Sequence, residues 1–142
     1  QFESELAEAC SPAHCNVRLL VYGALNGGAL TGKYLDVGAP SMADASARFN
    51  RFPTFQPRYK AARSAAATRE YVALARALNV SPAALAQAWC YSRHYVGCVI
   101  IGATSLEQLR ENFMARHVLL DKDILRQLDE IHVRHRNPNL AD

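Results

Sequence analysis

Two short apolar stretches, each running into a glycine-containing turn, constrain the fold of this chain more than any other feature. Asn16 to Tyr22 (NVRLLVY) and Val96 to Ile101 (VGCVII) are rich in aliphatic and β-branched side chains and show little polar alternation. Such stretches are typical of strands that are covered on both faces in a parallel sheet. Helical segments separate them, and this alternation predicts right-handed βαβ units and an α/β fold.

Helical periodicity occupies most of the remaining sequence. Ser81, Ser105 and Asp121 stand where N-caps are expected, with Pro82 at a first helical position and Gln108 at the capping-box spacing from Ser105. Apolar side chains at helical spacing predict helices over residues 2–10, 64–78, 82–89, 105–113 and 121–131, followed by an irregular tail after residue 134. The first of these helices is expected to bury one face.

The segment from residue 34 to 60 is predicted to be irregular. It contains Pro40, Pro53 and Pro57, and its second half contains Phe49, Phe52 and Phe55. An irregular stretch of this length is unusual inside a compact domain, and it is more often a functional lid or clamp than a plain connector.

The number of expected strands is too small for a complete parallel sheet. Two strands cannot bury both faces of such a sheet, and each would keep an exposed edge. We therefore interpret the sequence as part of a larger α/β structure, and we expect the open edges to favour self-association.

Composition excludes several classes of protein. The chain has 142 residues, a formal net charge of +3 at pH 7 and 50% hydrophobic residues, unlike disordered chains or coiled coils. The longest apolar runs, such as CVIIGA, are far shorter than the ~20 residues of a membrane-spanning helix, and the N-terminus does not resemble a secretory signal. Four cysteines without a CxxC pair favour reduced thiols, so we expect a cytoplasmic protein with Cys90, Cys98 and the single Trp89 buried.

The turn after the first strand has residue types suited to an anion. Gly27 and Gly28 permit positive φ and close approach of the backbone, and Lys33 adds a charge at the end of the turn. The spacing matches neither a Walker loop nor GxGxxG. A flexible connection between a strand and a helix is the alternative.

The turn after the second strand, IIGATSLEQLREN, opens a helix. Gly102 turns the chain and Thr104 or Ser105 caps the helix, whose N-terminal amides suit a phosphate. Gln108, Glu111 and Asn112 are expected on a common side, where they would bind a nucleotide base and ribose. A well-capped surface helix with a polar face is the alternative.

Taken in order, VYGALNGGALTGKY and SPAALAQAWCYSRHYVGCVIIGATSLEQLRENF resemble the C-terminal half of an aldo-keto reductase. The branch with aflatoxin-aldehyde reductases and potassium-channel β subunits is the most similar. The resemblance implies the C-terminal part of a (β/α)8 TIM barrel, incomplete in this chain, that binds NADP(H) at the ends of its strands. The positions that match the family's cofactor contacts are Tyr22, Gly23, Leu25, Asn26, Gly27, Gly28, Lys33, Gly102, Thr104, Gln108, Glu111 and Asn112.

The resemblance also assigns roles to these positions. Tyr22 matches the aromatic residue that stacks on the nicotinamide. Residues 25–28 and Lys33 match the loop beside the pyrophosphate. The five positions from Gly102 to Asn112 match the contacts to adenosine and its extra phosphate. The family usually has Ser-Pro after the stacking aromatic, whereas this chain has Gly23-Ala24. The family's catalytic Asp, Tyr, Lys and His belong to earlier strands, so no catalytic residue is assigned here.

The resemblance therefore predicts the cofactor-binding portion of an NADP(H)-dependent oxidoreductase that reduces aldehydes or ketones, inactive on its own. A non-catalytic cofactor-sensing or interaction module is an alternative. A second alternative is a DNA-binding helix-turn-helix over residues 73–91, in which Gln87 and Arg93 would contact the bases. The apolar composition of its second helix suggests burial instead. Cys10, His14 and Cys15 lack a fourth metal ligand. We expect a small carbonyl substrate and neither nucleic acid, membrane nor metal as partner.

Overall fold

Two parallel strands, β1 (Leu19–Val21) and β2 (Val96–Val99), form the sheet of this α/β structure. The computed structural model describes residues 2–35 and 45–139. Leu19 pairs with Val96 and Val21 with Val99, and the amide of Ile100 donates to the carbonyl of Val21 at 2.8 Å. The parallel pairing confirms the predicted βαβ topology, and both carboxyl ends lie at one edge of the sheet.

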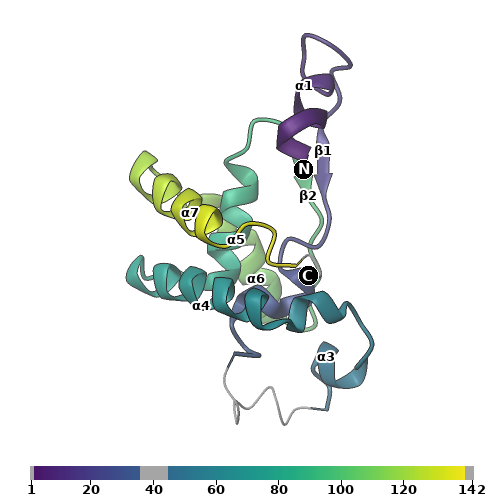
Figure 1. Cartoon of the computed structure of the whole chain (residues 1–142), viewed down its shortest axis with the longest axis vertical. Helices are drawn as coiled ribbons and strands as arrows, with labels where there is room; N and C mark the ends of the chain where they lie inside the picture. Colours follow the sequence, from purple (N-terminus) through teal and green to yellow (C-terminus); the bar gives the residue numbers. More distant parts are fainter. Residues whose placement is uncertain (1, 36–44, 140–142) are drawn as a thin grey trace.

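Helices make up the larger part of the described chain (Figure 1). They begin and end close to the predicted positions, and the N-terminal one consists of a π-helix followed directly by a short α-helix. The helices are a π-helix at Phe2–Leu6, α1 (Ala7–Ala9), the 3-10 helix η2 (Asn26–Thr31), α3 (Arg48–Arg51), a 3-10 helix at Pro57–Lys60, α4 (Ala62–Ala77), α5 (Pro82–Tyr91), α6 (Leu106–Met114), a 3-10 turn at Ala115–His117 and α7 (Lys122–Arg134).

The hydrophobic core lies between α4, α5 and α7. Leu74 and Ala75 of α4, Leu85 of α5, and Leu128 and Ile131 of α7 form one buried cluster. Partly buried side chains surround it, among them Trp89, over which the Arg93 guanidinium lies at 4.3 Å from the ring centroid. The sequence prediction that the tryptophan is buried holds in part, because its ring packs against the core at one side only.

Side chains cap the N-termini of two helices at the positions that the sequence predicted. The Ser81 hydroxyl accepts a hydrogen bond from the Ala84 amide at 3.0 Å, and the Asp121 carboxylate accepts one from the Ile124 amide at 2.8 Å. Each cap satisfies a backbone donor that has no partner within its helix, which is worth about 1 kcal/mol. These caps fix the starts of α5 and α7, the two helices that face each other across the core.

A charged clamp joins the middle of α4 to the C-terminal end of α7. The Glu70 carboxylate accepts hydrogen bonds from Arg134 Nη2 at 2.6 Å and from Arg134 Nε at 3.1 Å, and it pairs with His135 Nε2 at 2.6 Å. Hydrogen bonding to His135 and then to Arg134 holds the pKa of the Glu70 carboxyl below its ordinary value. The clamp adds a polar contact to the core packing between α4 and α7.

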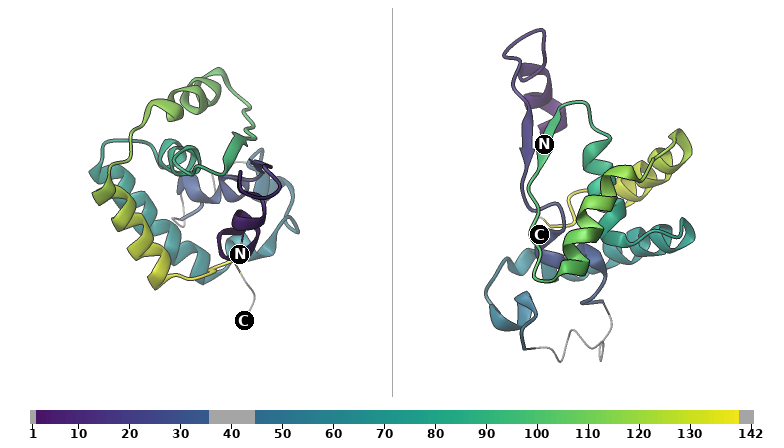
Figure 2. Two further views of the ribbon diagram at one scale, coloured as in Figure 1. Left: turned by 90° about the horizontal axis from the view of Figure 1, so that it is seen from above. Right: turned by 180° about the vertical axis from the view of Figure 1, so that it is seen from behind.

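The strands are shorter and more exposed than predicted. Leu20 in the middle of β1 is 61% exposed, and Cys98 in β2 is exposed as well, whereas Val99 is buried. The two strands and α1 project away from the helical layer as an arm (Figures 1 and 2), so no second layer covers their outer face. The prediction of strands covered on both faces is wrong for this structure, and so is the prediction that Cys98 is buried; Cys90 is buried as expected.

Two predicted apolar faces are less buried than expected. In the N-terminal helical segment Leu6 is exposed, whereas Phe2 and Cys10 are half-buried and the Phe2 ring centroid lies 5.2 Å from that of Tyr95. On α6, Leu106, Leu109 and Phe113 share a side as predicted, but all three are exposed. Periodicity identified the apolar faces correctly, but the described part of the chain covers the first only in part and leaves the second exposed.

The segment expected to be irregular contains two short helices. α3 and the 3-10 helix at Pro57–Lys60 lie within it, and Phe49 of α3 is buried whereas Phe52 is exposed. Pro40 and the rest of residues 36–44 lie outside the described residues. The expected irregular tail is confirmed for residues 135–139, where bends and turns replace the helix.

Candidate functional site

The two glycine turns start side by side at one edge of the sheet. Tyr22 and Gly23 follow β1, and Ile100 and Ile101 follow β2, with the strands hydrogen-bonded up to Ile100. Ligand sites in parallel α/β sheets lie outside the carboxyl ends of the strands. The topology therefore brings the starts of both predicted binding segments to the edge where such a site is expected.

The first turn has the backbone that its glycines predicted. Gly27 and Gly28 have φ of 66° and 98°, inside a kinked 3-10 helix. A Cβ on Gly28 would lie 3.2 Å from Cε of Lys33. The Thr31 hydroxyl donates to the carbonyl of Gly28 at 2.8 Å and closes the turn. The turn is thus a defined structure, which argues against a merely flexible connection.

Residues of α3 and the chain after it pack on this turn, which the sequence did not indicate. A Cβ on Gly27 would lie 2.8 Å from Cε1 of Phe55 and 3.7 Å from Cδ of Arg48. The Phe49 ring stacks on the Tyr34 ring with a centroid separation of 4.4 Å. The glycine at position 27 therefore allows the segment from residue 45 to 60 to lie against the turn. The only sequence signal for Arg48 was its place in a stretch of basic and aromatic residues.

The described segments that form this turn and pack on it are basic, although Glu3 and Asp129 line the cavity beside it. Residues 23–35 and 45–69 contain no Asp or Glu. Cations lie over aromatic rings there, with Lys33 Nζ 5.0 Å from the Tyr34 centroid and Lys60 Nζ 5.4 Å from the Phe49 centroid. The basic residues of these two ranges are Lys33, Arg48, Arg51, Arg58, Lys60, Arg63 and Arg69. Such a concentration of like charge attracts anionic ligands.

The second turn is held from inside the protein. Asn112 of α6 donates from Nδ2 to the carbonyl of Gly102 at 3.3 Å and accepts at Oδ1 from Gln87 Nε2 at 2.6 Å. Asn112 is 4% exposed and Gln87 is 1% exposed. The expected common side of Gln108, Glu111 and Asn112 is therefore not one open face, because Gln108 is exposed, Glu111 half-buried and Asn112 buried.

The N-terminus of α6 is capped by its own side chains. The Ser105 hydroxyl accepts from the Gln108 amide at 3.3 Å, and Gln108 Oε1 accepts from the amide and the hydroxyl of Thr104 at 2.9 and 3.1 Å. In a capping box the Gln108 side chain would accept from the amide of the N-cap residue, Ser105. Here it accepts from Thr104, one residue earlier. Hydrogen bonds from its own backbone and from Ser105 lower the pKa of the Glu107 carboxyl, which places a negative charge at this helix end.

A cavity of about 420 Å³ lies between the end of β1 and the helical layer. Tyr22, Gly23 and Asn26 line it together with residues of α4, α5 and α7. Tyr22 is 75% exposed, so its ring is available for stacking. No residue from 102 to 112 lines this cavity, nor does Lys33. The structure therefore gathers three of the predicted site residues in one hollow, and the later set lies beyond it.

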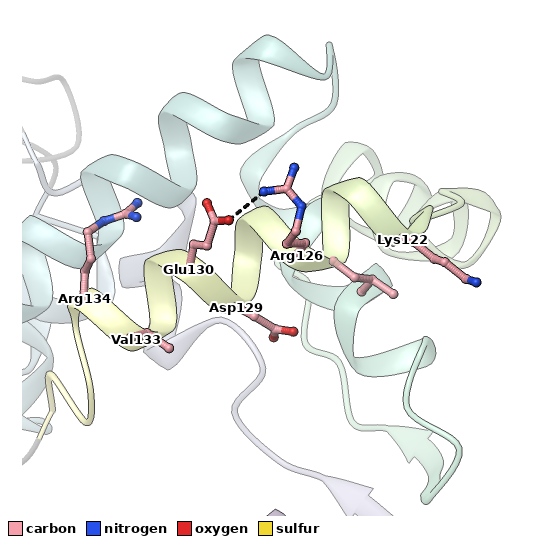
Figure 3. A pocket seen from close by; sticks show the side chains of 7 residues that line it. Lys122, Arg126, Asp129, Glu130, Val133 and Arg134 are labelled. Carbon is pink, nitrogen blue, oxygen red and sulfur yellow. Dashed lines mark hydrogen bonds and ion pairs between the residues drawn. The ribbon is translucent and has the colours of Figure 1, made fainter.

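A second hollow runs along the outer side of α7 and does not involve the glycine turns. Figure 3 shows its lining, which comes from this helix alone and includes the ion pair of Arg126 Nη1 with Glu130 Oε1 at 2.6 Å. Within residues 2–35 and 45–139, no three His, Cys, Asp or Glu side chains come together as metal ligands. No helix in those ranges has both the length and the apolar character needed to cross a membrane.

Comparisons with known proteins define the class. The pattern of the aldo/keto reductase family matches residues 1–133. An aldo-keto reductase of Babesia bovis is 33% identical over 97% of this chain and 48% of its own length. Protein tas of Escherichia coli is 35% identical over 92% of this chain and 36% of its own length. A putative voltage-gated potassium channel subunit beta of Schizosaccharomyces pombe is 32% identical over 78% of this chain and 33% of its own length.

The chain belongs to the aldo/keto reductase family, a family of oxidoreductases. It spans about half, or about a third, of the length of these relatives. The family fold is a (β/α)8 barrel, and the two parallel strands with their helices are consistent with part of such a barrel. The DNA-binding alternative loses its main support, since Gln87, one of its two candidate base readers, is buried.

Proposed function

We propose that this chain is the cofactor-binding part of an NADP(H)-dependent oxidoreductase that reduces aldehydes or ketones. The pairing of β1 with β2 supports the proposal most directly, because it brings both glycine turns to one edge of the sheet. A dinucleotide has two ends joined by a charged pyrophosphate, so two neighbouring glycine turns suit it.

The residues of the first turn fit a dinucleotide. Gly27 and Gly28 have no Cβ and so adopt positive φ without strain, and the described segments that pack on the turn, residues 45–69, contain cations and no acid. Lys33 and Arg48 are the cations nearest to these glycines, and they would balance the charge of the pyrophosphate. Tyr22 presents an exposed ring on which the nicotinamide would stack.

The second turn would take the adenosine end. Gly102 and Thr104 are exposed at the start of α6, where the helix dipole favours an anion. The charge of Glu107 opposes this, so the phosphate contact depends on the exposed Gln108 and on the backbone rather than on the helix end alone. When bound, NADPH supplies a hydride to a carbonyl carbon; the general acid is not among the residues assigned in this chain.

Binding and turnover are separate tests of the proposal. Titration of the 142-residue chain with NADPH, followed by the change in nicotinamide fluorescence, is expected to give saturable binding that weakens as salt is added. Aldehyde-dependent oxidation of NADPH by the same material is expected to be absent. The lack of any saturable NADPH binding, with circular dichroism showing a folded chain, would contradict the cofactor assignment. Turnover would contradict the assignment of the general acid elsewhere.

A non-catalytic interaction role is the second candidate. The exposed Leu20 on β1 and Phe113 on α6 offer apolar surface to a partner. One relative bears the name of a channel subunit, which describes an assembled protein. Self-association of the chain that changes when NADPH binds would favour this role, whereas self-association that is independent of NADPH would not.

A further inference from the structure

Gln87 is a polar side chain in the middle of an apolar helix, and no part of the proposed function uses it so far. It is 1% exposed and is the largest side chain that the described structure buries completely. Its neighbours along α5 are mainly alanines and Leu85. Within the described residues its Oε1 atom has no hydrogen-bond partner. A buried acceptor left in this way costs about 1–3 kcal/mol, so stability does not explain the choice of glutamine.

The single hydrogen bond of Gln87 leads to the second glycine turn. Gln87 Nε2 donates to Asn112 Oδ1 at 2.6 Å, and Asn112 Nδ2 donates to the carbonyl of Gly102 at 3.3 Å. These bonds join α5, α6 and the turn after β2 into one chain. Because Asn112 accepts at Oδ1 from Gln87, its amide is oriented with Nδ2 toward Gly102.

Beyond this bond, Gln108 holds the turn at Thr104, whose amide and hydroxyl donate to Gln108 Oε1, but nothing packs against Gly102 itself. Gly102 is exposed, and a Cβ added there would meet no heavy atom within 4 Å. Residues 101–110 are all exposed. Side-chain packing therefore leaves the position of the turn undetermined, and the bond from Asn112 sets the direction of the Gly102 carbonyl.

We propose that Gln87 is a positioning residue, which orients Asn112 and so holds the Gly102 turn in the geometry that binds the phosphorylated adenosine end of the cofactor. This inference rests on the proposed function. Without the Gln87 bond the Asn112 amide can rotate, and the turn samples conformations that do not bind. Only a fraction of the molecules then has the turn in the binding conformation. The affinity for the cofactor falls by that fraction, although the contacts in the complex stay the same.

The test compares Gln87→Met with Leu85→Met in the same protein. Methionine fills the volume of glutamine and removes both the hydrogen bond and the unsatisfied acceptor. Leu85→Met alters the neighbouring core position of α5 without touching Asn112 and serves as the matched control. The probes are adenosine 2′,5′-bisphosphate, titrated by calorimetry, and amide hydrogen exchange at residues 102–105 in the absence of any ligand.

Gln87→Met is expected to melt near the wild-type temperature, because it removes the unsatisfied Gln87 Oε1 but leaves the buried Asn112 Oδ1 without its donor. It is expected to bind adenosine 2′,5′-bisphosphate about 5- to 10-fold more weakly and to exchange faster at the turn, whereas Leu85→Met changes neither property. Unchanged binding and exchange in Gln87→Met would overturn this inference alone. An unfolded Gln87→Met protein would also overturn it, because the side chain would then be structural. Failure of the wild type to bind either the bisphosphate or NADPH would overturn the proposed function as well.

Discussion

Gly28 and Lys33 approach each other so closely that a Cβ on the glycine would lie 3.2 Å from Cε of the lysine. The glycine also has φ of 98°, a conformation that other residues adopt only with strain. The first glycine turn therefore does two things at once, since it bends the chain and leaves space for the stem of a basic side chain. This relationship links the backbone of the turn to the place of a charge that the proposed cofactor needs.

Replacement of Gly28 by alanine is expected to destabilise the protein by about 1–2 kcal/mol, the cost of the left-handed conformation. The new methyl group also displaces Lys33, so NADPH binding is expected to weaken by more than the loss of stability explains. Thermal unfolding and NADPH titration measure the two effects. Gly32→Ala is the control, because it imposes the same left-handed strain, with φ of 82°, but its Cβ would meet Val72 and not Lys33. An equal loss of NADPH binding in the two variants would contradict this account of the turn.

Tyr22 is expected to contribute to binding through its ring and not its hydroxyl. The side chain is 75% exposed beside the cavity at the end of β1. Stacking on an aromatic face is worth roughly 1 kcal/mol, so Tyr22→Ala should weaken NADPH binding by about 5- to 10-fold, whereas Tyr22→Phe should retain it. Titrations with NADPH and with adenosine 2′,5′-bisphosphate separate the ends of the cofactor. An equal loss for the bisphosphate would argue against a nicotinamide contact.

The local features of this fold could be predicted from the sequence because short-range chemistry decides them. Ser81 and Asp121 cap helices for reasons that lie within three residues of each, and Gly27 and Gly28 stand where the chain needs positive φ. The parallel pairing followed from the order of strands and helices. In each case the deciding contact lies close in sequence or follows from a general rule of topology.

The burial and the long-range contacts could not be predicted in the same way. Leu20 reads as a buried strand residue, yet its exposure depends on whether another layer covers it. Gln87 was a candidate DNA contact because it is the polar residue of its helix, and its bond to Asn112 spans 25 residues. The packing of Arg48 and Phe55 on Gly27 likewise has no periodic signal. Each of these depends on the tertiary structure rather than on local pattern.

Stability is expected to depend on pH through the Glu70 clamp. The pKa of the Glu70 carboxyl lies below its ordinary value of 4.5, first through the hydrogen bond with His135 and then through Arg134. A carboxyl with a lowered pKa stabilises the native state fully above its unfolded value, and this contribution is lost as the pH falls through the native value. Glu70→Gln should therefore lower the urea midpoint at pH 6, and its difference from wild type should shrink as the pH falls below 4.5.

Glu130→Gln is the matched control for the clamp. Glu130 pairs with Arg126 within the exposed face of α7, so its loss leaves the contact between α4 and α7 intact. Exposed pairs within one helix contribute little to stability. A difference between Glu70→Gln and wild type that stayed constant from pH 6 to pH 3, or one no larger than that of Glu130→Gln, would count against a clamp that depends on ionised Glu70.

Self-association through the sheet is the remaining expectation, and Leu20 is the residue that tests it. β1 and β2 form a two-stranded sheet that projects from the helical layer, and Leu20 lies 61% exposed on it. Unpaired strand edges with apolar side chains invite pairing with another copy, and a charged side chain at such a position prevents it. Leu20→Lys is expected to reduce the sedimentation coefficient of the chain at high concentration toward that of a monomer.

Leu119→Lys is the control for this prediction. Leu119 is even more exposed than Leu20 but lies between α6 and α7, away from the sheet, so its substitution should leave association unchanged. A wild-type chain that sediments as a monomer at every concentration would show that the edges are protected, and an equal effect of both lysines would point to net charge rather than to the sheet.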